Sequence, residues 1–574
     1  MGRPYPQPTE ARRQPWGDLG LATLFCGAVF VLAHFRALTD PFVINDDVRQ
    51  QIFWMQQWRD PALFPGDLLA DYSRHYVPWG LQGLYWLIAW VMSPIYFSKV
   101  LPGLLFVGLG GCLFEIGRRL GDRAMAWTTL GVFGLMPFFL GNLAGGLARA
   151  FAAPLLALFW LAWLTRKPWA MGLALLLQAL FIPYIFPLSA GAVLLAWVAG
   201  RLGKDDPPPF PAAWPHWGLL TLAAGLVVLF NLQFSSSGFG PLVSWSDMAH
   251  RPEFGPHGRF AIVPMPSVFL ELLRPWEFMA PFHEAGIMGG VLVCGVILGV
   301  ACWGFRGLDW GNLKTRLKPA GYLALASLAL YFLARLLLLR LFVPDRYLTY
   351  TLNLFYCLAL GLGLAAGLQV RRWPRLLAVP VALLVMGLSG FRLQGTEIYD
   401  YSAYRPLIAA LAQTPKDALM AGHPNLMDVV PTFAGRPALA TFELAQPWAK
   451  GYWQKLEPRL RDLFAAYYAD DPQEVIAFCR KYRISFLIVD DRHFTPAFLA
   501  GNIFLVPLDR QVGPSETQPL AERIHSPFFA PFDEQIRALT RGRRQFALLS
   551  APLFQPRMVD EHIRLIDMRP WLEN

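Results

Sequence analysis

Long apolar runs separated by short polar stretches make up most of the first 390 residues of the chain. The runs are about 15–23 residues long, close to the roughly 20 that a helix needs to cross a bilayer. They lie at 17–37, 94–117, 124–142, 151–165, 169–183, 185–200, 216–233, 285–305, 320–341, 347–369 and 374–390. This pattern predicts a polytopic α-helical membrane protein with about eleven transmembrane helices. Pro183 and Pro187 interrupt the shortest runs, which suggests a broken or re-entrant pair there.

The polar loops between these runs alternate in charge. Every second loop is basic, and these loops fall on the same side as the arginines of the leader 1–16. The basic residues are Arg118, Arg119 and Arg123; Arg166 and Lys167; Arg201 and Lys204; Arg306, Lys314, Arg316 and Lys318; and Arg371, Arg372 and Arg375. Because cytoplasmic loops carry the excess of Lys and Arg, we expect a cytoplasmic N-terminus and an extracytoplasmic, for example periplasmic, C-terminal region. The first run has no signal-peptide cleavage motif, which predicts a retained helix.

Residues 391–574 follow a different pattern, with shorter apolar runs and more charge. Helix-like stretches at about 402–412, 450–468, 471–482 and 532–541 alternate with strand-like runs at 418–420, 486–489 and 546–549. This predicts a soluble extracytoplasmic α/β domain, long enough to bury a core of its own. The chain then divides into a membrane domain, 1–390, with large outer loops at 38–93 and 234–284, and a soluble domain, 391–574.

Composition agrees with a membrane protein. Of the 574 residues, 55% are hydrophobic and 16% are charged, whereas a soluble protein carries roughly a quarter charged residues. The net charge of +10 is explained by the cytoplasmic loops, and since no basic patch is interleaved with aromatic residues, we expect no nucleic-acid partner. The six cysteines have no CxxC spacing, so the sequence indicates neither a zinc site nor a disulfide framework.

An acidic turn, Asn45-Asp46-Asp47-Val48-Arg49, follows the first apolar run directly. One interpretation is helix capping, because Asn is a good N-cap and acids in a first turn gain about 0.3–1 kcal/mol from the helix dipole. The other is catalysis at the membrane surface, since aromatic residues typical of the membrane interface follow the turn. The two interpretations are compatible.

Transfer of a sugar from a polyprenyl phosphate would explain a carboxylate at this place. The donor already has a good leaving group, so the reaction needs a base that deprotonates the acceptor hydroxyl. It also needs cations beside the departing phosphate. A second carboxylate could orient the first or hold a divalent ion, Mg²⁺ or Mn²⁺. Asp46 and Asp47 are therefore the candidate ligands if a metal is used at all.

Asp46-Asp47-Val48-Arg49, directly after the first helix and ahead of a large outer loop, resembles the GT-C class of membrane glycosyltransferases. Within that class it is most similar to the Asp-Glu-x-Arg element of the aminoarabinose and protein O-mannosyl transferase branch. The resemblance implies that Asp46 is the catalytic carboxylate, Asp47 a supporting one and Arg49 a substrate-binding residue. Asp47 stands where that branch often has Glu.

Further polar residues follow in the same outer loop. Asp60 and Asp67 lie beside Pro and Gly and are explained by turn chemistry. The segment 71–76 has more hydrogen-bonding groups than a connector requires. Its candidate substrate-binding residues are Asp71, Arg74, His75 and Tyr76.

Three arginines are candidates for binding the donor phosphate. Arg149 lies at the outer start of the fourth apolar run, where it could bind an anion or simply reach out of the membrane to water. Arg335 lies inside a run, where an unpaired Arg costs at least about 2.5–3.5 kcal/mol and usually faces a cavity or a partner. Arg346 lies in a late outer loop, the place from which GT-C enzymes commonly contribute a phosphate-binding arginine, so the resemblance favours it.

Together these observations predict a membrane glycosyltransferase that uses a polyprenyl-phosphate sugar donor, with Asp46 as general base. Its partners would be the donor, membrane lipids and an extracytoplasmic acceptor, either a protein, a lipid or a glycan. Loop 234–284 is a candidate lid on the acceptor side. A glycolipid transporter or flippase is an alternative, although the sequence shows no paired halves with matching broken helices. A non-catalytic membrane assembly factor is a further alternative.

Overall fold

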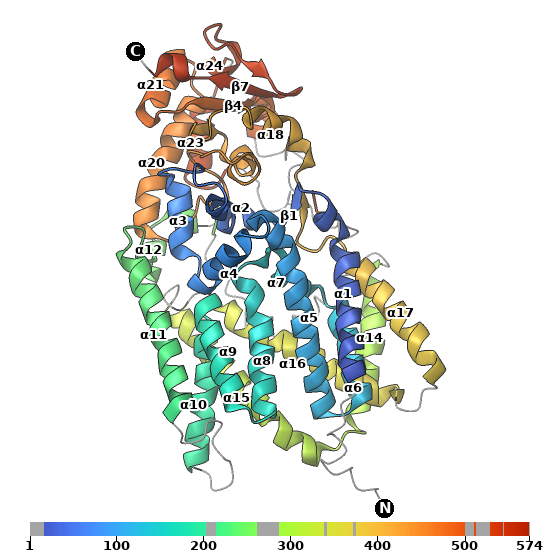
Figure 1. Ribbon diagram of the computed structural model, residues 1–574. Coiled ribbons are helices and arrows are strands. Elements are labelled where there is room, and N and C mark those ends of the chain that lie inside the picture. The colour runs from blue at the N-terminus through green and yellow to red at the C-terminus, as the bar shows by residue number, and fades with distance from the viewer. Residues whose placement is uncertain are drawn as a thin grey trace, which may run out of the picture.

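In the computed structural model, apolar helices run side by side through the lower two-thirds of the molecule (Figure 1). The structure describes residues 16–202, 214–255, 257–260, 286–337, 341, 343–370, 375–499, 510–511, 528–543 and 545–572. The long helices are α1 (Trp16–Thr39), α5 (Pro94–Leu120), α6 (Arg123–Leu135), α7 (Pro137–Leu143), α8 (Ala152–Leu164), α9 (Pro168–Phe181), α10 (Phe186–Leu202), α11 (Trp214–Ser236), α14 (Gly286–Phe305), α15 (Trp310–Leu336), α16 (Asp345–Gly367) and α17 (Arg375–Arg392).

Each predicted apolar run coincides with one of these helices or with the bent pair α6 and α7, which meet at Pro137 at an angle of 64°. Among the described residues, five helices are long and apolar enough to cross a membrane, or six if the bent pair is one span. The other apolar helices have 10–17 described residues, so a multi-pass architecture is supported while eleven crossings stays a prediction. The break predicted near Pro183 lies between α9 and α10, which are separate helices.

The two ends of the bundle differ in charge, as the alternation of the loops predicts. At one end, Asp18 in the first turn of α1 pairs with Arg123 at 2.7 Å. There too, the Arg316 guanidinium donates to the Arg119 carbonyl at 2.6 Å, so the basic loops after α5 and α14 lie together. The opposite end carries the first outer loop and the C-terminal region (Figure 1).

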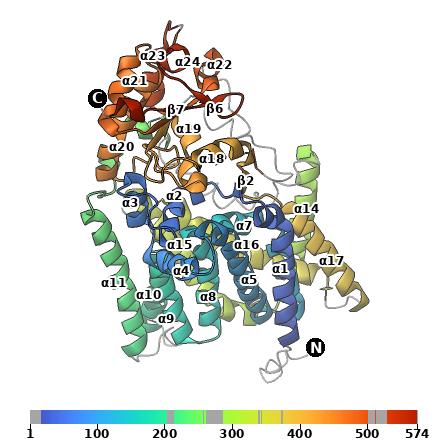
Figure 2. The same ribbon diagram turned by 45° about the horizontal axis from the view of Figure 1, so that its top comes forward.

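The first outer loop is folded into short elements rather than one long helix. These are β1 (Val43–Ile44), α2 (Val48–Gln51), the 3-10 helix η2 (Phe53–Trp58), α3 (Leu68–Tyr76) and α4 (Trp79–Ala89). Pro61, Pro65 and Pro78 separate the elements because proline cannot continue a helix from its interior. In both ribbon views α2 lies between the helix bundle and the C-terminal region (Figures 1 and 2).

The C-terminal region contains a four-stranded sheet in the order β3-β4-β7-β6, surrounded by helices. The strands are β3 (Met420–Gly422), β4 (Phe486–Asp490), β6 (Arg557–Met558) and β7 (Ile563–Asp567), with β3 parallel and β7 antiparallel to β4. The helices are α18 (Arg405–Leu411), α19 (Pro424–Met427), α20 (Lys450–Tyr467), α21 (Pro472–Tyr482), α22 (Pro496–Leu499), α23 (Phe532–Thr540) and α24 (Ala547–Ser550). All four predicted helices are therefore confirmed, as are the strands near 418–420 and 486–489.

The predicted strand at 546–549 is wrong, because this segment forms α24. A four-residue apolar run cannot be assigned to a strand or a helix by its periodicity, and Ala and Leu both favour helix. The antiparallel neighbour of β4 is instead β7. Ile563 of β7 pairs with Asp490 of β4, and Asp567 pairs with Phe486.

The C-terminal region and the first outer loop are joined rather than separate. Strand β1 pairs with β2 (Tyr399–Asp400), which pairs in turn with β5 (Arg510–Gln511). Arg36 at the end of α1 binds Asp400 at 2.7 Å. Buried apolar residues of the helix bundle, the outer loop and the C-terminal region form one continuous cluster. The predicted domain boundary near residue 391 thus stays a prediction, although it falls just before the end of α17.

Candidate active site

The acidic turn is held by hydrogen bonds within the turn and by one hydrogen bond to Glu397, at the start of the C-terminal region. The Asn45 side chain donates to the Glu397 carbonyl at 2.7 Å and accepts from the Asp47 backbone N–H at 3.2 Å. Asp46 Oδ1 accepts from the same N–H at 2.9 Å. The turn therefore has a fixed backbone from which the two carboxylates project.

Asp47 is at the N-cap position of α2 but makes no capping hydrogen bond with its side chain. Its carboxylate forms an ion pair with Arg149 and accepts a hydrogen bond from the Gln50 amide. Helix capping therefore does not account for the Asp47 side chain, which instead binds a cation from a different part of the chain.

Two glycines bring the Arg149 segment close to the turn. Gly145 has a φ of 82°, in the left-handed region that favours glycine, and a Cβ there would lie 2.7 Å from Asn45 Oδ1. Gly146 has a φ of 60°, also in the left-handed region, and a Cβ there would lie too close to the Tyr85 hydroxyl. Side chains at these positions would push the segment away from the acidic turn. The 3-10 helix η4 (Ala148–Phe151), which carries Arg149, follows directly.

Asp46 lies in a crowded, mainly acidic environment. Burial raises its pKa well above the usual range, and the negative charges of Asp47, Glu443 and Glu397 raise it further. Arg149 is the cation that opposes this rise. The side chain itself remains partly accessible. A carboxylate with a raised pKa is a stronger base once it is deprotonated, so this environment suits proton abstraction.

Arg49 is buried, with a side chain only 4% exposed. Its guanidinium lies 3.8 Å from Asp428 and 3.7 Å from Glu443, and its Cζ lies 4.5 Å from the centre of the Tyr401 ring. Its Nε donates to the Asp46 carbonyl at 3.3 Å. All these partners except Asp46 come from the C-terminal region. Arg49 thus connects that region to the acidic turn.

A second arginine reinforces this connection from the outer loop after α11. Arg259 binds Glu443 at 3.2 Å and donates to the Ala445 carbonyl at 3.1 Å. The Glu443 backbone N–H donates to Asp428 at 2.9 Å, and burial raises the pKa of Asp428 to about 7 against the attraction of Arg49. Most of loop 234–284 beyond Arg259 lies outside the described residues, so its role as a lid stays a prediction.

Arg149 also connects the acidic turn to Arg346. It interacts electrostatically with Asp46 and Asp47 on one side and with Arg346 on the other. Arg346 interacts in turn with Tyr350 and Tyr184, whose hydroxyls are 3.4 Å apart. Two guanidinium groups and two phenol hydroxyls thus interact electrostatically in a chain that begins at the carboxylates. This is a set of donors that can bind a phosphate.

Of the other predicted site residues, Tyr76 contacts the acidic turn or its neighbours, and Arg335 has a partner elsewhere. Tyr76 lies at the site, since its hydroxyl donates to the Gln50 carbonyl at 3.3 Å and it interacts with Asp47. Arg335 instead donates to the Tyr331 hydroxyl at 2.8 Å, one turn earlier on α15. That bond gives it a local partner, and it has no described contact with the acidic turn.

On α3, Asp71 and Arg74 are partly exposed and pair with each other at 3.6 Å. Arg74 also donates to the Gln57 side chain at 2.6 Å. His75 hydrogen-bonds the Asp71 carbonyl at 2.7 Å and packs against Phe239. These three residues lie on the outer loop without a described contact to Asp46 or Asp47. Their role in binding substrate stays a prediction.

The donor set around the acidic turn does not fit a divalent cation well. Among the described residues, no group of three or more His, Cys, Asp and Glu side chains is arranged to hold a metal. Asp47 is engaged by Arg149 and Gln50, so a metal would have to displace a guanidinium to use both carboxylates. A metal held by Asp46 and Asp47 stays a prediction.

No family model matches the chain, and no curated protein matches it. Solved structures do. The oligosaccharyltransferase of Archaeoglobus fulgidus in the apo form has 11% identity and a TM-score of 0.47, covering 86% of this chain and 71% of its own. The same archaeal enzyme, AglB, in complex with an inhibitory peptide and a dolichol-phosphate has 13% identity and a TM-score of 0.40, covering 84% and 70%.

ArnT from Cupriavidus metallidurans in the apo state has 12% identity and a TM-score of 0.40, covering 97% of this chain and 99% of its own. All these TM-scores are below 0.5, so the chemistry has to follow from the site itself.

Several residues near the acidic turn were not predicted from the sequence. Tyr350 could have been found, since it follows Arg346 by four residues, the spacing that puts two side chains on one face of a helix. Tyr184 lies in the break between α9 and α10, where the prolines were the only signal. Glu397 and Glu443 carry no local signal, because only the folded chain brings them to Asp46.

Proposed function

We propose that this chain is a membrane glycosyltransferase that moves a sugar from a polyprenyl-phosphate donor to an extracytoplasmic acceptor. The proposal is supported by the ion pair between Arg149 and Asp47, the residue after Asp46, and by the electrostatic interactions of Arg149 with Asp46 and Arg346. An inverting transfer from a lipid phosphate requires a base close to a phosphate-binding set.

In the proposed reaction, Asp46 accepts the proton of the acceptor hydroxyl. The acceptor oxygen forms a bond to the anomeric carbon while the bond from that carbon to the phosphate oxygen breaks. The electron pair of the breaking bond leaves with the polyprenyl phosphate. Arg149 and Arg346 stabilise the charge that develops there, and hydroxyls of Tyr184 and Tyr350 can donate to the phosphate oxygens.

Asp47 has a supporting role in this scheme. Its ion pair holds Arg149 beside Asp46, so that the base and the phosphate-binding cation keep a fixed separation. Arg49 positions the turn from the other side through the Asp46 carbonyl and the buried acids of the C-terminal region. Arg49 therefore acts as a positioning residue, although the resemblance implied substrate binding.

The Asp46→Asn variant tests the proposal. We expect transfer, measured as polyprenyl phosphate released from a panel of polyprenyl-phosphate sugars, to fall by about 10²–10⁴-fold, because the amide cannot accept the proton. The variant should melt at the same temperature as the parent or higher. A carboxyl whose pKa is raised on folding destabilises the fold at neutral pH, and the substitution removes that cost.

Asp60→Asn is the matched control, since Asp60 is an outer-loop carboxylate that pairs with Lys416 at the surface. It should keep the parent rate. Unchanged turnover in Asp46→Asn would contradict the proposal. Translocation of the glycolipid without any covalent product would instead support a flippase.

A further inference from the structure

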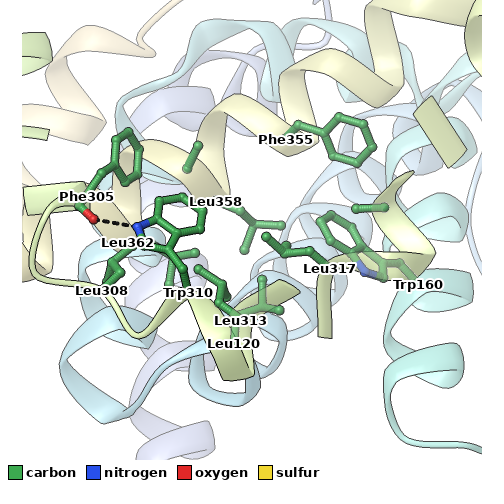
Figure 3. Close-up of a pocket in the computed structure, with 12 residues that line it drawn as sticks. Leu120, Trp160, Phe305, Leu308, Trp310, Leu313, Leu317, Phe355, Leu358 and Leu362 are labelled. Atoms are coloured by element: carbon green, nitrogen blue, oxygen red, sulfur yellow. Dashed lines mark hydrogen bonds between the residues drawn. The ribbon is translucent and has the colours of Figure 1, made fainter. Parts of the chain in front are cut away.

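A pocket with an entirely apolar lining lies at the end of the helix bundle remote from the acidic turn (Figure 3). Its wall comes from the last residues of α5 and α14, from α8, from the first half of α15, from the middle of α16 and from the connection between α14 and α15. Leu120, Trp160 and Phe355 line its interior, whereas Trp310 is 44% exposed and lies toward the outside. The pocket is therefore open at the end of the bundle.

The connection between α14 and α15 is held in a fixed shape at this opening. The Trp310 indole donates to the Phe305 carbonyl at 2.9 Å, as the dashed line in Figure 3 shows. Asp309 caps α15 by accepting from the backbone N–H groups of Gly311 and Asn312 at 3.1 and 3.4 Å. The pocket is thus built by ordered elements. Aromatic side chains at such a position are typical of the boundary between lipid tails and headgroups.

Exposed basic residues are next to several of the lining residues along the chain. Lys314 and Arg316 alternate along α15 with Leu313 and Leu317, which line the pocket. Arg316 reaches the carbonyl of Arg119, the residue before Leu120, and Arg306 follows Phe305. The nearby acids are already used, since Asp309 caps α15 and Glu115 pairs with Arg118 and Arg119. The rim of the pocket therefore carries an excess of positive charge.

One hydrogen-bond donor in the wall lacks a partner. Trp160 is 1% exposed, and its Nε1 has no hydrogen-bond acceptor among the described residues. A buried donor without an acceptor costs about 1–3 kcal/mol.

We propose that this pocket binds one acyl chain of an anionic phospholipid whose phosphate lies against Arg306, Lys314 and Arg316. In a bilayer, the apolar species at hand is a lipid chain, and a cluster of basic residues beside the membrane attracts an anionic headgroup. The site is separate from the acidic turn and does not depend on the proposed glycosyl transfer.

Native mass spectrometry of the full chain, purified in detergent and stripped of lipid, tests the proposal. Phosphatidylglycerol and phosphatidylcholine with the same acyl chains are the probes. We expect at least about fivefold greater retention of phosphatidylglycerol, which is the effect of one basic side chain near a membrane surface. Phosphatidylglycerol, but not inorganic phosphate, should raise the melting temperature.

Two variants locate the site. Ala320→Phe fills the pocket and should abolish the retention of phosphatidylglycerol, while Leu325→Phe, at a 56% exposed position of the same helix, should not. Lys314→Gln combined with Arg306→Gln should remove the preference over phosphatidylcholine. If Ala320→Phe lowers the melting temperature without lipid, Ala359→Leu replaces it as the filling variant. Equal retention of the two lipids by the parent, unchanged retention in the filling variant, or an equal effect of inorganic phosphate would overturn the proposal.

Discussion

Asp46 has three acidic neighbours and one basic neighbour, and this imbalance sets the chemistry of the residue. Burial and the charges of Asp47, Glu443 and Glu397 all favour its protonated form, while Arg149 favours the carboxylate. The group therefore stays protonated to a higher pH than an ordinary aspartic acid. If it is the base, the rate should depend on pH well above the usual range of a carboxyl group.

We expect kcat/KM to rise with pH through an apparent pKa well above 4, because only the deprotonated form of Asp46 accepts a proton. The Arg149→Gln variant should move this rise to still higher pH, since the variant loses the charge that lowers the pKa of Asp46. Initial rates between about pH 5 and 9 measure both effects. A rise centred near pH 4, or one that Arg149→Gln leaves in place, would rule out Asp46 as the base.

At the scale of elements, the buried ion network around Arg49 joins α2 to the segments that carry Asp428 and Glu443. Loss of one partner from a buried network leaves the others without compensation, which typically costs about 3–5 kcal/mol. A local substitution in the outer loop should then weaken the attachment of the whole C-terminal region.

We expect Arg49→Met to lower the free energy of unfolding by about 3–5 kcal/mol, because Asp428 stays buried and loses its ion pair with Arg49. Arg74→Met is the control, since Arg74 is exposed and its loss should cost about 1 kcal/mol or less. Chemical denaturation in detergent measures both. Equal stabilities of the two variants would show that the Arg49 network does not hold the elements together.

A second set of elements meets at two buried histidines in the C-terminal region. The rings of His423 and His493 lie 4.4 Å apart, and the His493 Nδ1 hydrogen-bonds the Tyr467 hydroxyl at 2.9 Å. Neither ring nitrogen of His423 has a hydrogen-bond partner among the described residues. Burial lowers the pKa of His493 to about 3, with the charge of Arg492 adding to the shift, and burial lowers the pKa of His423 well below its usual value.

Both histidines are thus neutral in the folded state, and the unfolded chain binds their protons first as the pH falls below about 6.5. Stability should therefore decrease from pH 6.5 downward, by about 1.4 kcal/mol per pH unit for each histidine until its folded pKa is reached. His423→Phe should flatten this dependence and raise the melting temperature at pH 7, because it removes two unpaired buried nitrogens. Melting curves of parent and variant between pH 4 and 7.5 measure the effect, and parallel curves would contradict it.

At the scale of the whole molecule, charge separates the two ends of the bundle. The end with Asp18, Arg119 and Arg123 carries the basic loops, and the other end carries the acidic turn and the C-terminal region. By the positive-inside rule we expect the first end to face the cytoplasm. The candidate site would then work on extracytoplasmic acceptors.

We expect a membrane-impermeant maleimide to label Lys416→Cys, but not Lys167→Cys, in sealed right-side-out vesicles. Both positions are exposed and lie at opposite ends of the bundle. Lys167→Cys should be labelled only after the vesicles are made permeable, and the parent chain reports the background from its own cysteines. Labelling of Lys167→Cys alone would place the candidate site in the cytoplasm.

The sequence by itself determined the positions of the helices, the alternation of the basic loops and the location of the acidic turn. These features depend on local composition, because an apolar run of sufficient length becomes a helix in a bilayer whatever surrounds it. The sequence determined the short elements of the C-terminal region less well, because the helix α24 lies where a strand was predicted.

Only the tertiary structure decided what each charged residue does. It gave Asp47 a partner in Arg149, placed Arg49 among buried acids and left Arg335 beside Tyr331. It also brought Glu397 and Glu443 to Asp46 from distant parts of the chain. The energy of a charge depends on which groups surround it and how far it is removed from water, and neither follows from the neighbours of a residue along the sequence.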